Sequence, residues 1–421
     1  MFDNLYRNKR VFLTGHTGFK GSWLTEWLLL LGAEVHGYAL DPQPHEVLFD
    51  QLGLAPRLAS DTRADLADRD ALLSAIDAAS PAVIFHLAAQ PLVRLSYDIP
   101  VETFATNVMG TAHVLEAIRQ LNRPCTVVCI TTDKCYENRE WLHAYREEDA
   151  MGGHDPYSAS KGAAELVIAS YRKSFFGRKV ENGKLKAEIR LASARAGNVI
   201  GGGDWAMDRI IPDCIRALRK GQVMTVRNKV ATRPWQHVLE PLSGYLWLGA
   251  CLAEENSEMR KLKAEIEQKE LSAEPSAFQL STLNSQLSSS NSQLSSSLSC
   301  ASRFSRLPSE LSSAFNFGPS LTSNRTVAEL VQELLKHTGG EWSDASDPNA
   351  LHEASKLNLA IDKAFHLLGW QPVWNFEHTI ATTANWYIEE AAGKNVHELT
   401  MQQIQAYHAA ASAKNLAWTR E

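Results

Sequence analysis

Residues 11–23 read VFLTGHTGFKGSW, an apolar run that leads directly into a glycine-rich turn. The turn contains three glycines at a spacing of three: Gly15, Gly18 and Gly21. Residues 11–14 predict a short buried strand, and the apolar residues of 22–31 predict a helix that ends at Gly32. Glycines between a strand and a helix let backbone N–H groups approach a pyrophosphate at the helix N-terminus. The alternative is a tight turn that binds no ligand.

Strand-like and helix-like segments alternate after this turn. Predicted strands cover 35–40, 82–87, 126–131 and 194–199, and predicted helices cover 71–78, about 103–120 and 157–176. This alternation is typical of parallel strands joined by right-handed crossovers. We therefore predict an α/β fold: a Rossmann-type doubly wound parallel sheet with a smaller C-terminal substrate-binding domain.

The chain divides into a main domain, a second part and an insertion. Residues 1–200 mainly form the nucleotide-binding domain, whereas 201–254 and 314–410 form the substrate-binding part, with some segments returning to the main domain; 411–421 is a tail. The segment 255–313 differs in composition, and its stretch 281–299 contains ten serines. Such a sequence cannot bury a core, so we expect a low-complexity, disordered insertion. It could instead be a partner-binding segment.

Composition restricts the class of protein. The 421 residues are 44% hydrophobic and 21% charged, which is typical of a soluble globular protein. The net charge of −6 argues against a nucleic-acid partner. No apolar run reaches the roughly 18 residues of a membrane helix, and we expect no signal peptide. Six cysteines without paired CxxC spacing favour free thiols in a reducing cytoplasm and predict no metal site.

Three segments after the glycine turn are candidates for the rest of a dinucleotide site. Asp41 lies twenty residues past Gly21, where a carboxylate can bind ribose hydroxyls, although it could be a turn residue. Residues 34–46 contain no Lys or Arg to hold a 2′-phosphate, which favours NAD over NADP. Asp65-Leu66 follows a predicted third strand and could contact the adenine, or Asp65 could only cap a helix.

The fourth predicted strand ends in the segment HLAAQ at 86–90, which contains two small residues. Leu87, Ala88 and Ala89 would let the cofactor lie against the backbone. His86, immediately before them, could equally be a packed structural histidine.

Tyr157 and Lys161 are one helical turn apart and therefore face the same side of their predicted helix. A nearby Lys cation lowers the pKa of a phenol from about 10, which would make Tyr157 a usable base near neutrality. This spacing also occurs by chance in many helices. Here Asp155-Pro156 opens the helix, and Thr132 could bond the same substrate oxygen as Tyr157.

Asp133 and Lys134 follow the strand 126–131, at the carboxyl edge where such sheets bind ligands. A simple dehydrogenase needs no further acid. A dehydratase does, because hydroxide is a poor leaving group and must be protonated as it departs. The site is therefore predicted to perform a dehydration, unless Asp133 is an ordinary loop carboxylate.

Four stretches make the chain recognisable as a whole. They are TGHTGFKGSW at 14–23, TTDKCYEN at 131–138, RAGNVIGGGDW at 195–205 and RPWQHV at 233–238. With these stretches the chain closely resembles the CDP-D-glucose 4,6-dehydratase family of the extended short-chain dehydrogenase/reductase superfamily. The resemblance covers about 10–250 and 314–410 and leaves out the Ser-rich insertion.

The resemblance implies conversion of CDP-D-glucose to CDP-4-dehydro-6-deoxy-D-glucose, with NAD bound and regenerated in each cycle. It implies a step toward 3,6-dideoxyhexoses of O-antigen and lipopolysaccharide, and a homodimer with contacts through the helices at 103–120 and 157–176. Tyr157 would take the C4 hydroxyl proton with support from Thr132 and Lys161, and Asp133 would protonate the departing C6 hydroxyl.

The expected site residues follow from the motifs and this resemblance together. The cofactor would contact Gly15, Thr17, Gly18, Phe19, Gly21, Asp41, Asp65, Leu66, Leu87, Ala88, Ala89, Tyr157 and Lys161. The substrate would contact Gln90, Arg94, Asn198, Arg209, Arg227, Arg233 and His237, because Arg forks match phosphate oxygens. Each of these arginines could instead be a surface charge.

Lys134 departs from the wider pattern of nucleotide-sugar dehydratases. The related dTDP-glucose enzymes carry glutamate at this position, a natural base for the C5 proton. A lysine serves as base only if its pKa falls from about 10.4. Our hypothesis is that Lys134 acts at C5, either as base or by stabilising the enolate. A dehydratase or 4-epimerase for another sugar nucleotide, or a non-catalytic NAD-binding sensor or scaffold, are the alternatives.

Overall fold

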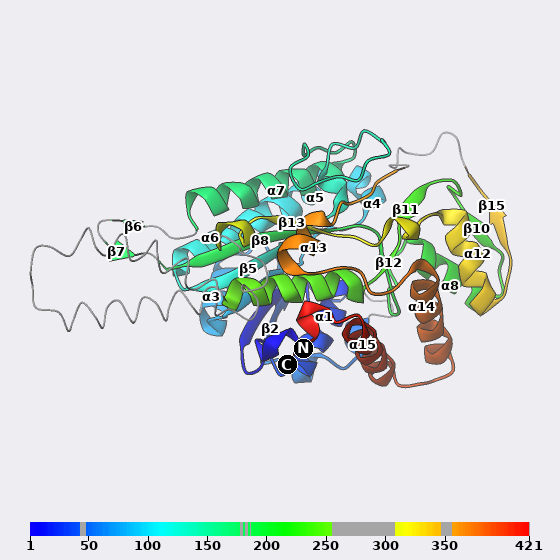
Figure 1. The fold of residues 1–421 in the computed structure, drawn as a ribbon, viewed down its shortest axis with the longest axis horizontal. Coiled ribbons are helices and arrows are strands. Elements are labelled where there is room, and N and C mark those ends of the chain that lie inside the picture. Colours follow the sequence, from blue (N-terminus) through cyan, green and yellow to red (C-terminus); the bar gives the residue numbers. More distant parts are fainter. Residues whose placement is uncertain are drawn as a thin grey trace, which may run out of the picture.

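A seven-stranded parallel sheet forms the centre of the computed structural model (Figure 1). The structure describes residues 1–42, 48–176, 180–181, 184–185, 187–254, 308–346 and 356–420. The strands lie in the order β13-β8-β5-β4-β1-β2-β3. Their bounds are β1 Arg10–Thr14, β2 Glu34–Ala39, β3 Ser60–Arg63, β4 Val83–His86, β5 Cys125–Ile130, β8 Ile189–Ala196 and β13 Ala314–Phe317. The predicted doubly wound fold is confirmed.

The strand order reverses between β1 and β4, so the crossovers leave β1 toward opposite halves of the sheet. A crevice opens at the carboxyl ends of the strands where such a reversal occurs. The glycine turn follows β1, and the catalytic candidates 132–134 follow β5. The topology therefore brings both predicted motifs to one edge of the sheet.

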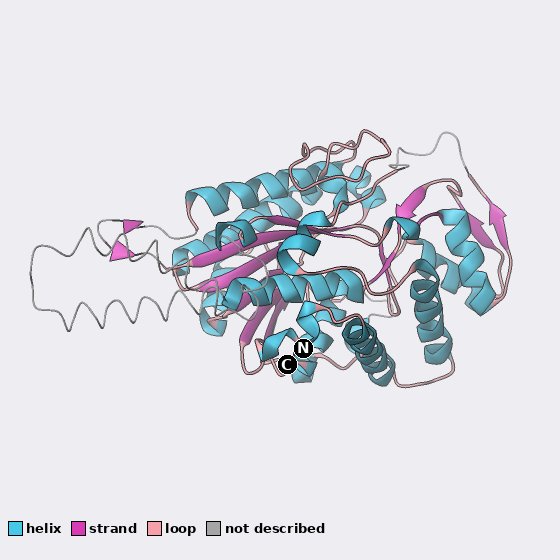
Figure 2. Ribbon diagram, in the orientation of Figure 1, coloured by secondary structure: helices cyan, strands magenta, loops and turns pink. Residues whose placement is uncertain are grey.

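Helices cover both faces of the sheet (Figure 2). One face packs on α3 (Arg69–Ala79), α6 (Gly110–Leu121) and α7 (Pro156–Ser174). The other packs on α1 (Phe19–Leu30), the helix at 239–254 and α15 (Val396–Ala413). Buried apolar side chains on both surfaces are what a parallel sheet requires.

The helix predicted at about 103–120 consists of three pieces. They are α5 (Pro100–Phe104), a π-helical turn at Ala105–Met109 and α6. Asn107 lies inside the turn, where its amide donates to the Gln90 carbonyl and the Ser160 hydroxyl. These bonds tie the turn to the loop after β4 and to α7, and π turns are frequent at functional sites.

The C-terminal part gathers at one end of the sheet, on the right in Figure 1. Its short sheets pair β9 (Val199–Ile200) with β12 (Gln236–His237), β10 (Met224–Val226) with β15 (Trp342–Asp344), and β11 (Thr232–Pro234) with β14 (Asn324–Thr326). Its helices are α8 (Ile210–Arg219), α12 (Val327–Thr338) and α14 (Phe376–Ala391). The chain also forms shorter helices. In the main domain these are α2 (Leu48–Gln51) and α4 (Val93–Asp98), and later in the chain they are α11 (Pro308–Leu311) and α13 (Asp362–Leu368).

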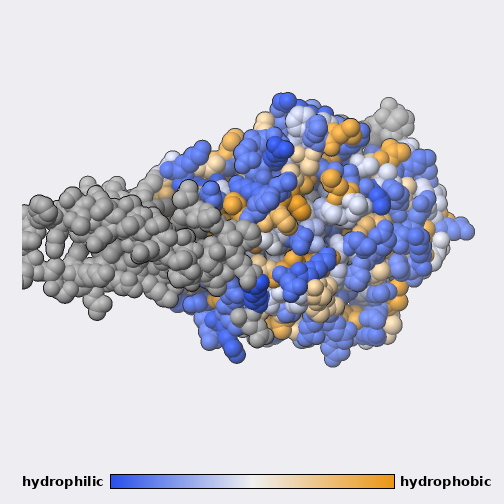
Figure 3. Space-filling view, viewed as in Figure 1, coloured by the Kyte–Doolittle hydropathy of each residue, from blue (hydrophilic) through white to orange (hydrophobic). Residues whose placement is uncertain are grey.

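Two of the predicted segments flank this part. Of the predicted insertion, 255–307 lies outside the described residues, and from Pro308 the chain forms α11 and enters β13. The predicted tail 411–421 packs onto the core: Trp418 is fully buried and stacks on Phe2 at 5.2 Å and on Tyr407 at 5.8 Å between ring centroids. Polar and apolar residues are interspersed over the face in Figure 3. No helix in the described ranges is long and apolar enough to cross a membrane.

Candidate active site

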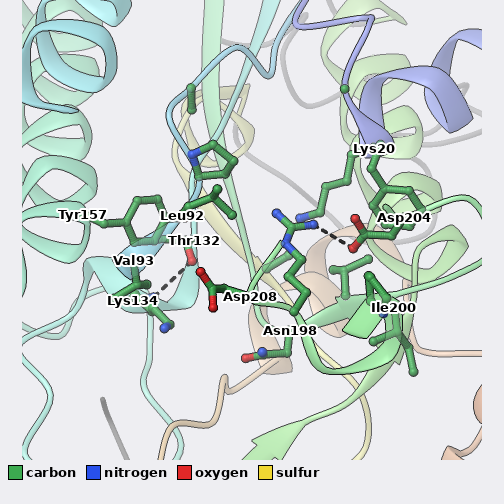
Figure 4. A pocket seen from close by; sticks show the side chains of 18 of the residues that line it. Lys20, Leu92, Val93, Thr132, Lys134, Tyr157, Asn198, Ile200, Asp204 and Asp208 are labelled. Atoms are coloured by element: carbon green, nitrogen blue, oxygen red, sulfur yellow. Dashed lines mark hydrogen bonds and ion pairs between the residues drawn. The ribbon is translucent and has the colours of Figure 1, made fainter. Parts of the chain in front are cut away.

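A pocket of about 760 Å³ lies at the carboxyl edge of the sheet, lined by the main domain and by the C-terminal part. Its size is in the range of small-molecule and cofactor sites. The glycine turn lines one side, and the loop after β5 lines another (Figure 4). Most of the predicted site residues line it. Asp41, Gln90 and His237 do not.

The glycine turn is shaped so that side chains could not replace it. Gly15 has a φ of +76°, and a Cβ there would lie 2.7 Å from the Ala88 nitrogen. A Cβ on Gly21 would lie 2.0 Å from the Gly15 carbonyl oxygen. Gly18 caps α1, and a Cβ there would meet only the Gly15 oxygen, at 3.5 Å. The first and third glycines are thus required by packing, and the middle one keeps the helix N-terminus open to a ligand.

The segments after β2, β3 and β4 continue the wall of the pocket. Leu66, Leu87, Ala88 and Ala89 line it, together with Thr17 and Phe19 from the turn. Asp65 also lines the pocket while its carboxylate accepts from the Ala67 nitrogen at 2.8 Å. The N-cap of α3 is Asp68 rather than Asp65, so the capping alternative for Asp65 is wrong.

His86 is a packed structural histidine. Its ring nitrogens bond the hydroxyls of Thr14 at 2.7 Å and Thr111 at 3.1 Å. Burial lowers its pKa to about 3. The ring therefore stays neutral and holds β4 to β1 and to α6.

Two of the predicted residues outside the pocket have other partners. His237 is fully buried between the rings of Trp23 and Trp374, at 5.9 and 4.9 Å, and burial lowers its pKa to about 3. The Gln90 amide donates to the Leu92 carbonyl and the Thr103 hydroxyl and accepts from the Leu92 nitrogen. The His237 ring is packed between aromatic rings, and the Gln90 amide is hydrogen-bonded within the protein. The structure therefore does not place either side chain in the pocket. Asp41 is exposed at the end of β2.

Tyr157 and Lys161 lie on the first two turns of α7, as predicted. Asp155 is the N-cap and accepts from the Ser158 nitrogen at 2.8 Å, with Pro156 in the first position. The side chains of Tyr157 and Lys161 are buried, and both residues line the pocket. The N-cap at Asp155 thus fixes where α7 begins and places Tyr157 in its first turn.

The predicted lowering of the Tyr157 pKa by Lys161 is wrong. Burial raises the pKa of Tyr157 to about 12, and a hydrogen bond with Thr132 opposes this shift. Among nearby cations, Arg209 rather than Lys161 has the largest opposing effect. Burial also lowers the pKa of Lys161 to about 8. Desolvation, which sequence spacing does not report, outweighs the attraction of the cation.

Asp133 lies between Thr132 and Lys134 at the start of a 3-10 turn (Asp133–Cys135). Its Oδ1 accepts from the Thr132 hydroxyl at 3.0 Å, whereas its Oδ2 has no hydrogen-bond partner among the described residues. The side chain is only 2% exposed, and burial raises its pKa; the cations Lys134, Arg233 and Lys20 oppose the shift. A buried carboxyl with one unpaired oxygen favours the protonated form, which is the form that donates a proton.

The predicted substrate arginines hold carboxylates on the C-terminal side. Arg209 lies 2.8 Å from Asp204, and Arg227 lies 2.6 Å from Asp208. Arg94, from the main domain, approaches the same Asp208 at 3.5 Å. Asn198 and the buried Arg233 also line the pocket. Positive groups thus face the pocket from both sides.

Several polar residues of the pocket were not predicted, among them the charged residues Lys20, Asp204 and Asp208. Burial, with the nearby Arg209, lowers the pKa of Lys20 to about 8. Lys20 could have been found as a lysine inside the glycine turn, and Asp204 as the acid in the string at 195–205. Asp208 carried no signal, because its place at the pocket depends on a left-handed backbone at φ +61°.

Comparison with known proteins shows the family to which the chain belongs. The family model described as GDP-mannose 4,6 dehydratase matches residues 12–256. The chain belongs to this family. It is 40% identical over 408 residues to CDP-glucose 4,6-dehydratase of Salmonella typhimurium, a match that covers 97% of this chain and 98% of that protein. It is 28% identical over 183 residues to CDP-paratose 2-epimerase of Salmonella typhi, over 39% of this chain and 54% of the relative.

Solved structures share the fold of this GDP-mannose 4,6 dehydratase family member at lower identity. MoeE5 in complex with UDP-glucose and NAD superimposes with a TM-score of 0.64 at 21% identity, over 90% of this chain and 99% of that one. DesIV, a dTDP-glucose 4,6-dehydratase from Streptomyces venezuelae, gives 0.65 at 19%, over 91% and 98%. These likenesses support the fold described above.

Proposed function

We propose that this chain converts CDP-D-glucose to CDP-4-dehydro-6-deoxy-D-glucose and water. The observation that carries the proposal is Asp133, a buried acid whose Oδ2 has no hydrogen-bond partner in the described part of the chain and which shares its pocket with Tyr157 and Lys161. A redox step alone needs no such acid, whereas elimination of hydroxide does. The 40% identity to a CDP-glucose 4,6-dehydratase over nearly both full lengths supports the same reaction and the cytidine substrate.

The residues present fit NAD. Gly18 leaves the N-terminus of α1 open to a pyrophosphate, and Asp65, Leu66 and residues 87–89 extend this wall. Bound NAD⁺ would supply a hydride acceptor and, once reduced, a hydride donor. Lys161, buried on α7, would hold the cofactor ribose on the side that faces Tyr157.

Tyr157 is the proposed base of the first step. As C4 of the hexose is oxidised, the phenolate takes the proton of the C4 hydroxyl, and Thr132 bonds the same oxygen. Because burial raises the pKa of Tyr157 to about 12, the phenolate needs added positive charge near it. Lys161 and the cationic form of the cofactor would provide this charge once the site is filled.

Asp133 and Lys134 are the proposed pair for the elimination. The new C4 ketone acidifies the C5 proton, Lys134 in its neutral form removes it, and protonated Asp133 gives its proton to the leaving C6 hydroxyl, which departs as water. Lys134 is half-buried and lies next to Asp133 on the same turn. The hydride then returns to C6, and Lys134 gives the proton back to C5.

The diphosphate would be held by the arginines of the pocket rim. Arg94 and Arg227 both approach Asp208, at 3.5 and 2.6 Å, and Arg209, Arg233 and Asn198 also line the pocket. Guanidinium groups match phosphate oxygens in pairs. His237 and Gln90 have no part in this proposal, because the His237 ring is fully buried and the Gln90 amide is hydrogen-bonded to Leu92 and Thr103.

Turnover with a matched set of nucleotide sugars tests the function. Purified protein with NAD is offered CDP-glucose, dTDP-glucose, UDP-glucose and GDP-mannose, and the 4-keto product is measured. The expected result is turnover with CDP-glucose and a product lighter by one water. Turnover confined to another nucleotide would replace the substrate; 4-epimerisation without loss of water would replace the reaction; NAD binding without turnover would favour a sensor or scaffold.

We also propose a cytoplasmic homodimer that serves synthesis of O-antigen and other surface polysaccharide. Apolar side chains are exposed on the helices expected to pair: Val101 by 73%, Met109 by 52% and Leu166 by 62%. Exposed apolar side chains on adjacent helices favour association. Light scattering should give twice the mass of the chain, and Leu166→Glu should shift it toward the monomer. A monomeric wild type would contradict the dimer.

A further inference from the structure

The turn that carries Asp133 and Lys134 is anchored at both ends by one buried network. On its N-terminal side, the Thr131 hydroxyl donates to Glu165 Oε1 at 2.5 Å. On its C-terminal side, the Tyr136 hydroxyl accepts from Arg195 Nη1 at 2.7 Å. Glu165 and Arg195 bond each other at 2.9 Å. The chain from Thr131 to Tyr136 is thus closed into a loop by a single ion pair.

Glu165 joins three elements that carry site residues. It lies on α7, one turn beyond Lys161, and its Oε2 accepts from the Ser193 hydroxyl of β8 at 2.8 Å as well as from Arg195. Through Thr131 it also reaches the end of β5. Each carboxylate oxygen therefore holds a different strand against the catalytic helix.

Arg195 continues the network away from Glu165. Besides the Tyr136 hydroxyl, its Nη1 donates to the Glu147 carbonyl at 3.0 Å, and its guanidinium lies 5.0 Å from the Tyr136 ring centroid. The Tyr136 hydroxyl in turn donates to Asn316 Oδ1 of β13 at 2.8 Å. The position of Tyr136 is therefore fixed by two hydrogen bonds at its hydroxyl and by the Arg195 guanidinium that lies over its ring.

The ion pair lies behind the pocket. The side chains of Glu165 and Arg195 are each 4% exposed, and neither they nor Tyr136 line the cavity, whereas Thr131 to Lys134 do. Removal of one partner of such a pair leaves an unpaired buried charge. The network can therefore affect the reaction through the position of the turn and through the charge of Glu165, which raises the pKa of Lys161 against the effect of burial. Tyr136→Phe leaves that charge in place and so reports on the turn alone.

We propose that Glu165 and Arg195 are positioning residues that fix Asp133 and Lys134 relative to Tyr157. This proposal rests on the dehydratase function above. Because Tyr157 and Lys161 lie on α7 itself while Asp133 lies on the braced turn, loss of the brace impairs elimination more than C4 oxidation. A displacement of about 1 Å at reacting groups can lower a rate by about 10²-fold.

Glu165→Gln tests the brace, because it keeps the size of the side chain and removes the charge. The matched control is Glu188→Gln, which removes another buried ion pair, Glu188 with Arg190 at 2.7 Å. This pair lies at the start of β8, and neither residue lines the pocket. The first measurement is kcat and KM for CDP-glucose. The second compares the amount of bound NADH, which reports C4 oxidation, with deuterium exchange at C5, which reports the start of elimination. The third is amide hydrogen exchange over residues 131–136 in the protein without added ligands.

The expected result is a fall in kcat of about 10²-fold for Glu165→Gln with little change in KM, accumulation of bound NADH, loss of C5 exchange and faster amide exchange over 131–136. The proposal would be overturned if folded Glu165→Gln showed the same ratio of bound NADH to C5 exchange as the wild type. It would also be overturned if Glu188→Gln lost C5 exchange and accumulated NADH to the same extent as Glu165→Gln. If Glu165→Gln does not fold, Tyr136→Phe decides in the same way from the other end. Absence of wild-type turnover would refute the function, and amide exchange would still test the brace.

Discussion

Replacement of Asp133 by asparagine should separate the two halves of the reaction. The substitution keeps the shape of the side chain and removes the proton that elimination requires. Tyr157, Lys161 and the glycine turn are untouched, so C4 oxidation continues. The enzyme then stops after the first half-reaction, with reduced cofactor and 4-keto sugar in the pocket.

The size of the effect follows from the environment of the carboxyl group. A positioned general acid contributes about 10²- to 10⁴-fold, or about 3 to 5 kcal/mol of barrier. Asp133 is 2% exposed, and its Oδ2 is unpaired among the described residues. An unsatisfied buried polar group costs about 1–3 kcal/mol of folding free energy. Asparagine keeps a polar group at this place but cannot ionise, so it should lower kcat and, at pH values above about 4, raise stability by the cost of keeping Asp133 protonated.

The pH dependence of stability gives a second signature. Burial raises the pKa of Asp133 in the folded protein, so the folded state keeps this proton after the unfolded chain has lost it. The contribution of Asp133 to stability is therefore present below its ordinary pKa of about 4 and is lost as pH rises through the folded value. Asp133→Asn should remove that loss.

The assay combines stopped-flow absorbance at the NADH band, C5 exchange in heavy water and urea unfolding at several pH values. The expected outcome is persistent NADH, turnover lower by at least about 10²-fold, and an unfolding free energy above the wild-type value at neutral pH. An ordinary loop carboxylate would give turnover near wild type. Lower stability together with normal partition of the intermediates would refute the reasoning.

Three further changes have defined outcomes. Gly21→Ala places a Cβ 2.0 Å from the Gly15 oxygen and should abolish NAD binding in calorimetry. Lys134→Ala should stop C5 solvent exchange and dehydration while C4 oxidation continues, and unchanged turnover would reject its role. Buried Glu240, which accepts from the Val373 nitrogen, has its pKa raised to about 7 by burial, so about 3 kcal/mol of stability should be lost as pH rises from 4.5 to 7. Glu240→Gln should flatten this slope in urea unfolding.

The fold could be predicted because its signals are local. The glycine turn, the alternation of strands and helices and the end of each strand depend on residues next to one another in sequence. The helix at about 103–120 was less accurate, since its π turn depends on Asn107 bonds to the distant Gln90 and Ser160. The packed position of Trp418 could not be inferred from composition either.

The candidate site was predicted where residue type and spacing decide, and not where burial decides. Asp133 was predicted from its place after a strand, and Tyr157 and Lys161 from their place at the start of a helix; all three line the pocket. His237 belongs to an equally distinctive string, yet aromatic packing turns its ring into the core. The pKa of Tyr157 was predicted in the wrong direction, because proximity to Lys161 was weighed without desolvation.

The central claim is that one pocket performs oxidation, elimination and reduction on adjoining carbons of one sugar. CDP-glucose labelled with deuterium at C4 tests it directly, in single turnover with the wild-type protein and NAD. The account predicts that NMR finds the deuterium in the C6 methyl group of the 4-keto product. A product that retains deuterium at C4, or one whose methyl group carries none, would contradict it.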